Sequence, residues 1–443
     1  MELISFSNSD PGSVLSSVVD HNGVYLHLDF CPQHETSDPA ENKDRASSPI
    51  TKLLTSSTIG HLLMQRGKPK NRMLDYWVGI PLLNALGIFR RRRLVPSHVQ
   101  RIGVLCSPAL GDTLLLSGPL QDLRDAFPAA HIVHICTLQN LAAAEIIPGA
   151  DERLLVNLTS VARTTKQIRA QRFDVLLDFS VWQRLTAFYT MLSGAKFTVG
   201  FDTSGQHRSR AYDPVVKHSA ERHELENLRA LLSGSGLVPL IRSPHQPTVT
   251  ISRFTSEPFE GETDPIIFHP WASGKHARLR EWPEERWIAL ARRLEEDTTT
   301  FFITGAPSDL PRITQLVDHM RLAGLRAEPF ASQDGFFSLT RLLRRVRVVV
   351  SVNTGVMHLA AIEGAPTVAL NGPTAECRWG ARGPYVINVQ PADGSGAYLH
   401  LGFEFKGQPE DIMERITVDQ VVEACESLTA NYIGPEYAVS GRR

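Results

Sequence analysis

The chain has 443 residues and lacks any run of about 20 consecutive apolar residues, so we expect no helix that spans a membrane. Its first thirty residues lack a basic start followed by a long apolar stretch, and we therefore expect no secretory signal. An excess of either charge is also missing, because 46 Lys and Arg residues stand against 47 Asp and Glu residues, a net charge of -1. A protein without a broad positive field is poorly suited to coat nucleic acid, so we expect no nucleic-acid partner.

Closely spaced cysteines are absent too. The five cysteines are scattered, and no two have the spacing of a zinc site or a redox motif: Cys31, Cys106, Cys136, Cys377 and Cys425. This usage favours a reducing compartment, and we predict a cytoplasmic protein. No group of His, Asp and Glu residues has convincing metal-ligand spacing, and no Asp-x-Asp pair follows a predicted strand. We therefore expect phosphate binding without a metal and no resident cofactor.

Residues 1–70 are rich in Pro, Ser and acidic residues with little periodicity, which predicts a partly disordered N-terminal extension. Residues 71–100 are predicted as an amphipathic basic helix and its lead-in. Strands and helices then alternate over residues 101–240 and again over residues 265–416. The predicted strands are residues 102–106, 131–135, 154–156 and 174–178 in the first region, and residues 266–269, 301–304, 346–350 and 367–370 in the second. A segment rich in Pro and Gly, residues 241–264, is the predicted linker, and residues 417–443 form a final helix and tail.

The predicted helix at residues 71–93 has two interpretations. Apolar residues recur at helical spacing, basic residues lie on both sides, and the segment ends in Arg90–Arg93. A basic helix that carries an aromatic residue can lie in the interface of an anionic membrane, which would make the chain peripheral at the inner face of the cytoplasmic membrane. In the other interpretation the helix packs on the protein body and the arginine run is simply solvated.

The two alternating regions predict an α/β fold with two similar halves, each a parallel sheet with helices on both faces. Short, continuously apolar strands agree with burial on both sides. Ligands of such sheets bind at the carboxyl ends of the strands, so the turns after the strands are where we look for chemistry.

The turn after the first predicted strand reads Cys-Ser-Pro-Ala-Leu-Gly-Asp-Thr over residues 106–113. Gly111 permits an unusual backbone angle or the close approach of a ligand. Asp112, at the start of a helix predicted over Asp112–Ala126, could accept a proton from a substrate hydroxyl. The alternative is that Asp112 is an N-cap residue that only stabilises this helix.

Four turns in the second half carry polar residues and glycine. The loop over residues 269–283 holds Lys275 and Arg280 ahead of a helix that starts near Pro283, an arrangement suited to a phosphate group. Thr354 and Gly355 open a helix whose free N–H groups could hold a diphosphate. The turns 304–309 and 371–376 follow other strands. Several such turns together predict a nucleotide pocket.

In this order, the segments resemble the heptosyltransferase-type glycosyltransferases of glycosyltransferase family 9. The resemblance covers roughly residues 101–428 and depends on the turn at 107–115, on R-E-W-P-E-E-R-W (280–287), on N-T-G-V-M-H-L-A-A (353–361) and on N-G-P-T (371–374). It implies the GT-B fold, in which two Rossmann-like, doubly wound parallel-sheet domains face a central cleft. The N-terminal domain would bind the acceptor, and the C-terminal domain would bind the nucleotide-sugar donor.

The resemblance also implies an activity: inverting, metal-independent transfer of a sugar, often heptose from ADP-heptose, to a glycolipid such as lipopolysaccharide core. It makes Asp112 the general base, places Ser107 and Gly111 on the acceptor side, and puts Asn353 against the donor sugar. The residues assigned to the donor and its phosphates are Ser273, Lys275, Arg280, Thr304, Thr354, Gly355, His358 and Thr374.

Three residues depart from the family pattern. Asn353 and Ala375 stand where the family usually has aspartate, and Arg280 stands where it usually has lysine. An arginine still serves a phosphate, and it can do so bidentately. Fewer carboxylates near the sugar favour a donor that differs from heptose. Two alternatives stay open: a nucleotide-sugar epimerase of the same fold, and a non-catalytic sugar-nucleotide-binding protein at the membrane.

Overall fold

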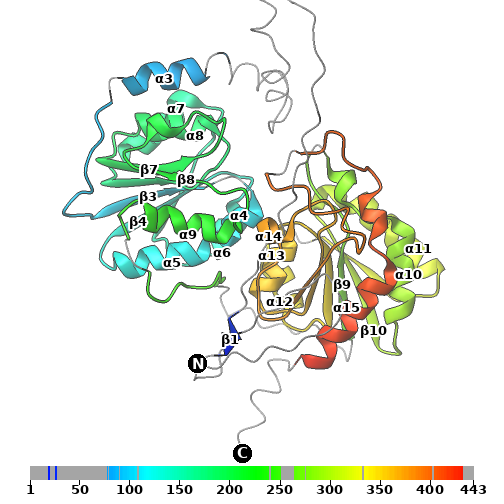
Figure 1. Cartoon of the computed structure of the whole chain (residues 1–443). Helices are drawn as coiled ribbons and strands as arrows, with labels where there is room; N and C mark the ends of the chain where they lie inside the picture. Colours follow the sequence, from blue (N-terminus) through cyan, green and yellow to red (C-terminus); the bar gives the residue numbers. More distant parts are fainter. Residues whose placement is uncertain are drawn as a thin grey trace, which may run out of the picture. The chain divides into compact units, whose positions relative to one another are not determined.

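The computed structural model describes residues 18–19, 25–26, 77, 79–88, 90–106, 109–238, 241–250, 264–274, 276–331, 334–401 and 404–432. The chain divides into two compact units, Met1–Ala46 and Ser47–Arg443. In the first unit, β1 (Val18–Val19) and β2 (Tyr25–Leu26) pair in antiparallel fashion. The rest of the predicted extension lies outside the described residues. The second unit contains two six-stranded sheets (Figure 1).

The first sheet has the strand order β5-β4-β3-β6-β7-β8, and all its neighbouring strands are parallel. Its strands are β3 (Arg101–Leu105), β4 (His131–Cys136), β5 (Glu152–Leu155), β6 (Val175–Asp178), β7 (Phe197–Asp202) and β8 (Val215–Lys217). The helices between them are α4 (Leu110–Leu115), α5 (Ser117–Ala126), α6 (Leu141–Ile146), α7 (Val161–Ala170), α8 (Arg184–Leu192), the 3-10 turn η3 (Ser209–Ala211) and α9 (Glu224–Gly234). α5 and α9 cover one face of this sheet, and α7 and α8 cover the other (Figure 1).

The second sheet repeats the arrangement, with the order β11-β10-β9-β12-β13-β14 and parallel neighbours throughout. Its strands are β9 (Asp264–His269), β10 (Thr299–Thr304), β11 (Ala327–Phe330), β12 (Val348–Val352), β13 (Thr367–Leu370) and β14 (Val386–Val389). Its helices are α10 (Glu284–Leu294), α11 (Leu310–Leu322), α12 (Phe337–Leu343), α13 (Gly355–Ile362), α14 (Glu376–Trp379) and α15 (Val418–Asn431), with 3-10 turns η4 (Ala277–Arg280), η5 (Pro307–Asp309) and η6 (Ile412–Arg415).

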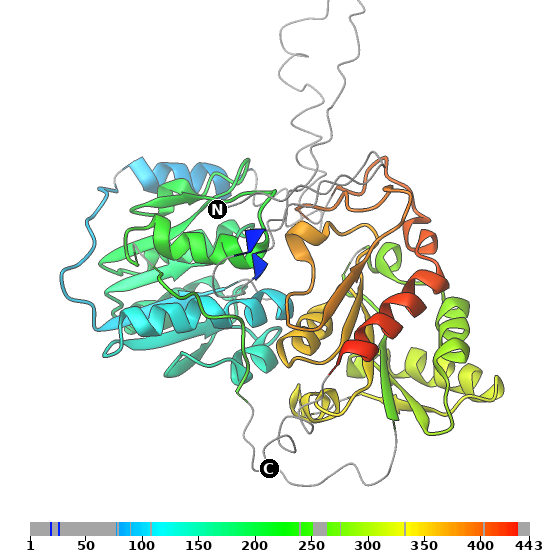
Figure 2. The ribbon, with the colours of Figure 1, turned by 60° about the horizontal axis from the view of Figure 1, so that its bottom comes forward.

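The two sheets confirm the predicted pair of doubly wound α/β domains. In each sheet the chain first builds outward to one side of its first strand and then returns to add the other side, so the order reverses between β3 and β6 and between β9 and β12. All five residues of β12 are buried, as expected for a strand that helices cover on both faces. Figure 2 shows α15 against the second sheet, where it contacts β13, β14 and α10.

Four strands were missing from the sequence prediction. Three of them, β8, β11 and β14, are edge strands of three or four residues, and their patterns of partial exposure give little apolar signal. β11 also contains Pro329, which is tolerated at a sheet edge. The fourth, β7, is interrupted by Gly200, where a Cβ atom would lie 2.2 Å from the Cζ atom of Tyr212. A glycine here permits close packing of the tyrosine ring on the strand.

The helix predicted over Asp112–Ala126 is two helices, α4 and α5, which meet at Leu116. Pro119 has no N–H group to donate to the carbonyl of Leu115. The Ser117 hydroxyl donates to the Leu114 carbonyl at 2.6 Å, which adds a local hydrogen bond outside the helical pattern. Both groups weaken a continuous helix at this point.

The basic segment before the first sheet also differs from the prediction. Its helix, α3, covers Ile80–Ile88 and is apolar around its circumference rather than amphipathic. Leu83 is its one buried residue, and the run Arg90–Arg93 follows the end of the helix. Among the described helices, none is both long enough and apolar enough to cross a membrane.

The first part of the predicted linker packs on the first half of the second unit. The backbone N–H of His245 donates to Asp122 at 2.8 Å, and the N–H of Thr248 donates to the Ser117 hydroxyl at 2.9 Å. Residues 241–250 therefore extend this half, and residues 251–263 lie outside the described part of the chain.

Candidate active site

The turns that follow β10, β9, β12 and β13 carry the residues predicted to bind the donor. These four strands are consecutive neighbours in the second sheet and run parallel, so their carboxyl ends meet at one edge. β9 and β12 flank the reversal of strand order, which is where doubly wound sheets bind ligands. The described residues that these turns bring to this edge are Ser273, Arg280, Thr304, Asn353, Thr354, Gly355, His358 and Thr374.

Thr354 is the N-cap residue of α13, a helix of eight residues. Its side chain makes no capping hydrogen bond, so it leaves the N–H groups of the first turn without that partner. Its Oγ1 atom is shielded from solvent and has no hydrogen-bond partner among the described residues. A buried hydroxyl without a partner is costly, and a bound oxyanion would satisfy both the hydroxyl and the helix terminus.

His358 lies one turn into α13 and is buried, with 5% of its surface exposed. Burial lowers the pKa of His358 to about 4, so its imidazole is neutral at pH 7. A Cβ atom on Gly111 of α4 would lie 2.9 Å from Cδ2 of this ring. The close approach that Gly111 permits is therefore that of the His358 ring.

Arg280 is the last residue of η4, in the loop between β9 and α10. One of its terminal nitrogens donates to the backbone carbonyl of Ser273, so the loop that holds both residues is closed on itself. The predicted helix start at Pro283 is confirmed, because Pro283 is the N-cap of α10. Lys275, the second predicted cation of this loop, lies outside the described residues.

The tryptophans of R-E-W-P-E-E-R-W belong to the core. Trp282 is 3% exposed and Trp287 is fully buried, with their rings 5.3 Å apart in an edge-to-face arrangement. The indole N–H of Trp282 donates to the Ile416 carbonyl at 2.9 Å, and that of Trp287 donates to the Trp282 carbonyl at 3.2 Å. This packing fixes the chain immediately after Arg280.

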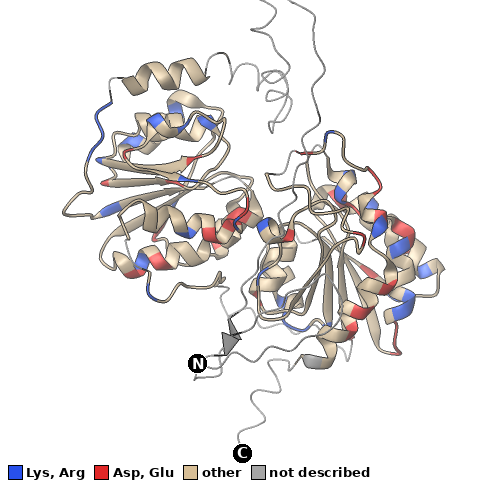
Figure 3. Ribbon diagram, viewed as in Figure 1, with Lys and Arg blue, Asp and Glu red and all other residues tan. Residues whose placement is uncertain are grey.

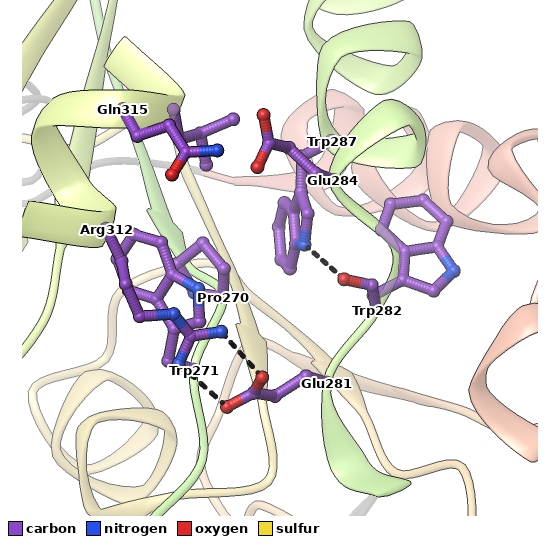
Figure 4. A pocket seen from close by; sticks show the side chains of 9 residues that line it. Pro270, Trp271, Glu281, Trp282, Glu284, Trp287, Arg312 and Gln315 are labelled. Carbon is purple, nitrogen blue, oxygen red and sulfur yellow. Dashed lines mark hydrogen bonds and ion pairs between the residues drawn. The ribbon is translucent and has the colours of Figure 1, made fainter. Parts of the chain in front are cut away.

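A cavity of 210 Å³ lies beside the same loop (Figure 4). Arg312 of α11 stacks over the Trp271 ring at 5.0 Å and pairs with both carboxylate oxygens of Glu281, at 2.7 and 3.2 Å. Glu281 also accepts a hydrogen bond from the N–H of Ala272. These contacts join the two ends of the loop, and no sequence signal had distinguished Trp271 or Arg312.

Thr304 and Thr374 both make contacts inside the second half. The Thr304 hydroxyl lies 3.1 Å from the Phe268 carbonyl and 2.9 Å from Nδ1 of His269, a buried residue whose pKa burial lowers to about 4. The N–H of Thr374 donates to the Asn371 carbonyl at 2.7 Å. These bonds hold the turns after β10 and β13 in place.

Asn353 is part of a chain of side-chain amides across three strand ends. Its Nδ2 donates to Oδ1 of Asn371 at 2.7 Å and to the Trp379 carbonyl at 2.9 Å. Asn371 donates in turn to Asn388 at 2.8 Å. The amide nitrogen of Asn353 is thus used inside the protein, and its oxygen is the polar atom left to meet a ligand.

Asp112 is the third residue of α4, and the N-cap of that helix is Ala109. The interpretation of Asp112 as an N-cap is therefore wrong, although it does lie in the first turn. Ser107 is outside the described part of the chain. α4 packs directly on α13: a Cβ atom on Gly355 would lie 2.9 Å from Cβ of Leu110 and 3.4 Å from the backbone nitrogen of Gly111. The structure thus brings the turn that carries Asp112 onto the turn that carries Thr354.

A buried ion pair, which sequence reasoning missed, lies close to these turns. Arg378 of α14 is fully buried and pairs with Glu224 of α9 at 2.9 Å, and His218 contacts the same Glu224 oxygen at 3.0 Å. The bonds to His218 and Arg378 overcome the opposing effect of burial and hold the pKa of Glu224 at about 2. No motif in the sequence marks this pair.

His223 adds a second link from the start of α9. Its Nδ1 accepts from the N–H of Leu225, so its Nε2 carries the hydrogen and donates to the Gly380 carbonyl at 3.0 Å. Burial lowers the pKa of His223 to about 3, which keeps the neutral tautomer that this arrangement needs. Across the described residues, no three His, Cys, Asp or Glu side chains gather as a metal site would require.

Residues 161–396 match the family model for glycosyltransferase family 9 (heptosyltransferase). The chain belongs to this family. Lipopolysaccharide heptosyltransferase 1 of Escherichia coli K12 is 25% identical over 292 residues, which cover 62% of this chain and 88% of the relative. This member of glycosyltransferase family 9 is therefore a glycosyltransferase, as the resemblance predicted.

Solved structures of related enzymes share the fold. A family 9 glycosyltransferase from Veillonella parvula has a TM-score of 0.65 and 20% identity, covering 75% of this chain and 98% of its own. Escherichia coli heptosyltransferase WaaC with ADP has a TM-score of 0.58 and 19% identity, covering 74% and 99%. The predicted GT-B architecture is confirmed, and the family assignment does not favour the epimerase or the non-catalytic alternative.

Proposed function

We propose that this chain transfers a heptose or a related sugar from a nucleotide-diphosphate sugar of the ADP-heptose type to a lipopolysaccharide-type glycolipid acceptor. The family assignment and a relative described as a lipopolysaccharide heptosyltransferase support the sugar and the acceptor class. A fold neighbour described as holding ADP supports the nucleotide. The observation that carries the proposal is the unpartnered Thr354 hydroxyl at the uncapped start of α13, against the turn that carries Asp112.

In the proposed reaction Asp112 accepts the proton of the acceptor hydroxyl as its oxygen bonds to the anomeric carbon. The bond from that carbon to the diphosphate oxygen breaks, and the nucleoside diphosphate leaves with the electron pair. A single displacement of this kind inverts the anomeric configuration. Arg280, the first-turn N–H groups of α13 and the Thr354 hydroxyl would stabilise the charge that develops on the leaving group.

The same groups explain why we expect the transfer reaction to need no metal ion. A guanidinium and a helix N-terminus can offset diphosphate charge without a divalent cation, and Lys275 is a further proposed contact. Asn353, through its amide oxygen, is the proposed contact to the sugar. Transfer should therefore continue at an unchanged rate after exhaustive treatment with EDTA.

We propose that the acceptor is met at a membrane surface. The chain would act as a peripheral protein on the cytoplasmic side, with the segment at residues 71–93 in contact with the membrane. The support is the apolar helix α3 followed by four consecutive arginines.

The replacement Asp112→Asn tests the proposed base. It keeps the shape of the side chain and removes the basic oxygen, so kcat should fall by about 10²–10⁴-fold while affinity for the donor stays near the wild-type value. Product formation by mass spectrometry and donor binding by calorimetry measure the two effects separately.

The matched control is Asp125→Asn, because Asp125 lies in the same half and its side chain is 70% exposed, in an ion pair with His245. This variant should keep the full rate. A wild-type kcat for Asp112→Asn would rule out Asp112 as the base, and failure of the wild-type protein to bind any nucleotide sugar would end the proposal as a whole.

A further inference from the structure

The segment from Trp77 to Val95 exposes an unusual amount of apolar surface. Ile88 is 68% exposed and Leu94 is 91% exposed, which is far more than a residue packed on the protein body would show. We name these side chains together the α3 patch: Trp77, Leu82, Leu86, Ile88, Leu94 and Val95. The remaining large exposed apolar residues of the described chain are dispersed over other elements. A concentration of this kind marks a surface that binds something.

The inner side of α3 is anchored, so the outward direction of the patch is fixed. Leu83 is 2% exposed and clusters with Ala187, Ala211 and Tyr212. Gly87 allows the helix to approach the chain at η3 closely, because a Cβ atom at this position would lie 2.6 Å from Cβ of Arg210. Arg210 therefore lies directly against the helix that carries the patch.

Two of the four arginines after α3 form ion pairs inside the protein. The buried carboxylate of Asp213 pairs with Arg90 at 2.9 Å and with Arg93 at 3.2 Å. Asp213 also accepts a hydrogen bond from the N–H of Thr198 at 2.8 Å. Arg90 and Arg93 thus fix the segment to the first sheet and are not available to an outside partner.

Arg91, Arg92 and Arg210 are exposed, and no carboxylate in the described part of the chain lies within ion-pair distance of them. Arg92 and Arg210 line a cavity of 260 Å³, together with Gly87, Arg90, Ser209 and Tyr212. Figure 3 shows α3 without charge along its length and a basic stretch directly after it. An uncompensated positive cavity therefore adjoins the apolar patch.

We propose that the α3 patch docks on an anionic phospholipid surface and that Arg92 and Arg210 together bind the phosphate of a lipid headgroup. This inference rests on the proposed function, because a glycolipid acceptor resides in a membrane. Charge complementarity selects the occupant: exposed guanidinium groups next to a helix with exposed apolar side chains match a bilayer interface, where phosphates lie directly above acyl chains. Arg210, from a segment more than a hundred residues away in sequence, completes the site with Arg92.

Vesicle cosedimentation of the full chain tests this inference. Wild-type protein should bind vesicles of phosphatidylcholine with about 30% phosphatidylglycerol and should bind pure phosphatidylcholine weakly. Each arginine near an anionic surface is worth about 1 kcal/mol, so the double variant Arg92→Glu/Arg210→Glu should bind at least tenfold more weakly. Binding of wild type should also fall as salt is raised, because exposed charges are screened.

Matched variants separate the α3 patch from general surface effects. Arg242→Glu/Arg292→Glu makes the same charge change at exposed sites outside the patch and should bind as wild type does. Leu82→Ser/Ile88→Ser should weaken vesicle binding, whereas Leu138→Ser/Leu322→Ser, at residues 78% and 86% exposed, should not. Equal binding by all four variants, or equal binding of neutral and anionic vesicles, would overturn the proposal.

Two further readouts keep the outcomes distinct. Transfer to a water-soluble acceptor without acyl chains should be unaffected in the α3-patch variants; if even wild type fails to transfer, the proposed function fails while the vesicle result stands. Analytical ultracentrifugation without lipid should show wild type and variants in the same state. A wild-type dimer that the α3-patch substitutions dissociate would assign the patch to a second copy of the chain and overturn lipid docking.

Discussion

At the level of single residues, hydrogen-bond partners decide what Asn353 can do. The sequence marks it as a departure from the aspartate that the family usually has, and the structure shows that its amide nitrogen donates to both Asn371 and Trp379. A carboxylate has no hydrogen to donate at this position. This position therefore needs a side chain that donates hydrogen bonds, which asparagine does and aspartate does not. Motif spacing alone does not reveal that need.

We therefore expect Asn353→Asp to destabilise the fold. Two buried or half-buried oxygen atoms lose their donor, which costs about 1–3 kcal/mol in the free energy of unfolding. Urea denaturation at pH 7.5 measures the change. Asn157→Asp is the control, since Asn157 is exposed and uses only its oxygen, which accepts from Thr159 at 2.8 Å. Equal stability of the two variants would contradict the role given to the amide nitrogen.

Residue identities near the turns were predicted from motifs, but their partners were not. Arg280 was predicted to lie beside a helix start, and it does precede the N-cap of α10. Its bond to the Ser273 carbonyl and the stacking of Arg312 on Trp271 depend on side chains that meet only after folding. Such contacts have no fixed spacing in the sequence, so no pattern announces them.

At the level of elements, the contact between α4 and α13 places the two ends of the proposed site together. Gly355 permits that contact, because a side chain there would lie 2.9 Å from Cβ of Leu110. The glycine was predicted for its place at a helix start. Its packing against another helix could not be predicted, because the sequence does not say which helix it meets.

Gly355→Ala should lower kcat roughly tenfold while the protein stays folded. The added methyl group displaces α4 by a fraction of an ångström, and small misplacements of catalytic groups lower the reaction rate strongly. Steady-state kinetics and the thermal midpoint give the two measurements. Gly234→Ala is the control, since its Cβ would meet the Val216 methyl groups at 3.2 Å, also a tight contact but at the end of α9. A full rate in Gly355→Ala would show that the α4–α13 contact does not position the base.

Interior elements were predicted better than edge elements, for a physical reason. The predicted strand at Thr367–Leu370 matches β13, which is buried along its whole length. The edge strands β8, β11 and β14 are short and partly exposed, so composition separates them poorly from loops.

At the level of the whole molecule, four buried histidines link stability to pH. Burial lowers the pKa of His134, His269 and His358 to about 4 and that of His223 to about 3, against 6.5 in the unfolded chain. The unfolded state therefore binds protons first as the pH falls. This contribution to stability is complete above pH 7 and is lost as the pH falls from about 6.5 towards 4, by about 1.4 kcal/mol per pH unit for each histidine.

His134→Leu should remove the contribution of one histidine from the pH dependence of the free energy of unfolding. His134 is fully buried in β4, and neither ring nitrogen has a hydrogen-bond partner in the described structure, so an apolar replacement removes titration without removing a contact. Urea denaturation from pH 7.5 to 4.5 should show a slope lower by about 1.4 kcal/mol per pH unit below about pH 6, and no difference in slope near pH 7.5. The exposed His98→Gln should leave the slope unchanged. If His134→Leu kept the full wild-type slope, His134 would not be one of the groups that bind a proton on unfolding.

The paired sheets were predictable because strand and helix periodicity repeats twice along the chain, and parallel sheets require it. Which residues would join the two halves was not predictable. Glu224 and Arg378 are separated by more than 150 positions, and neither belongs to a motif. Each of these charged residues gains its ion-pair partner only when folding brings the two halves together.

The burial of Glu224 and Arg378 restricts how the two nucleotide folds can move. Their side chains are 2% and 0% exposed, so a motion that pulled them apart would strand both ions in surroundings that solvate neither. Rotations that keep the carboxylate on the guanidinium cost far less. We therefore expect any opening that admits substrate to pivot about the start of α9 and α14, with its largest displacement at the elements farthest from that pivot.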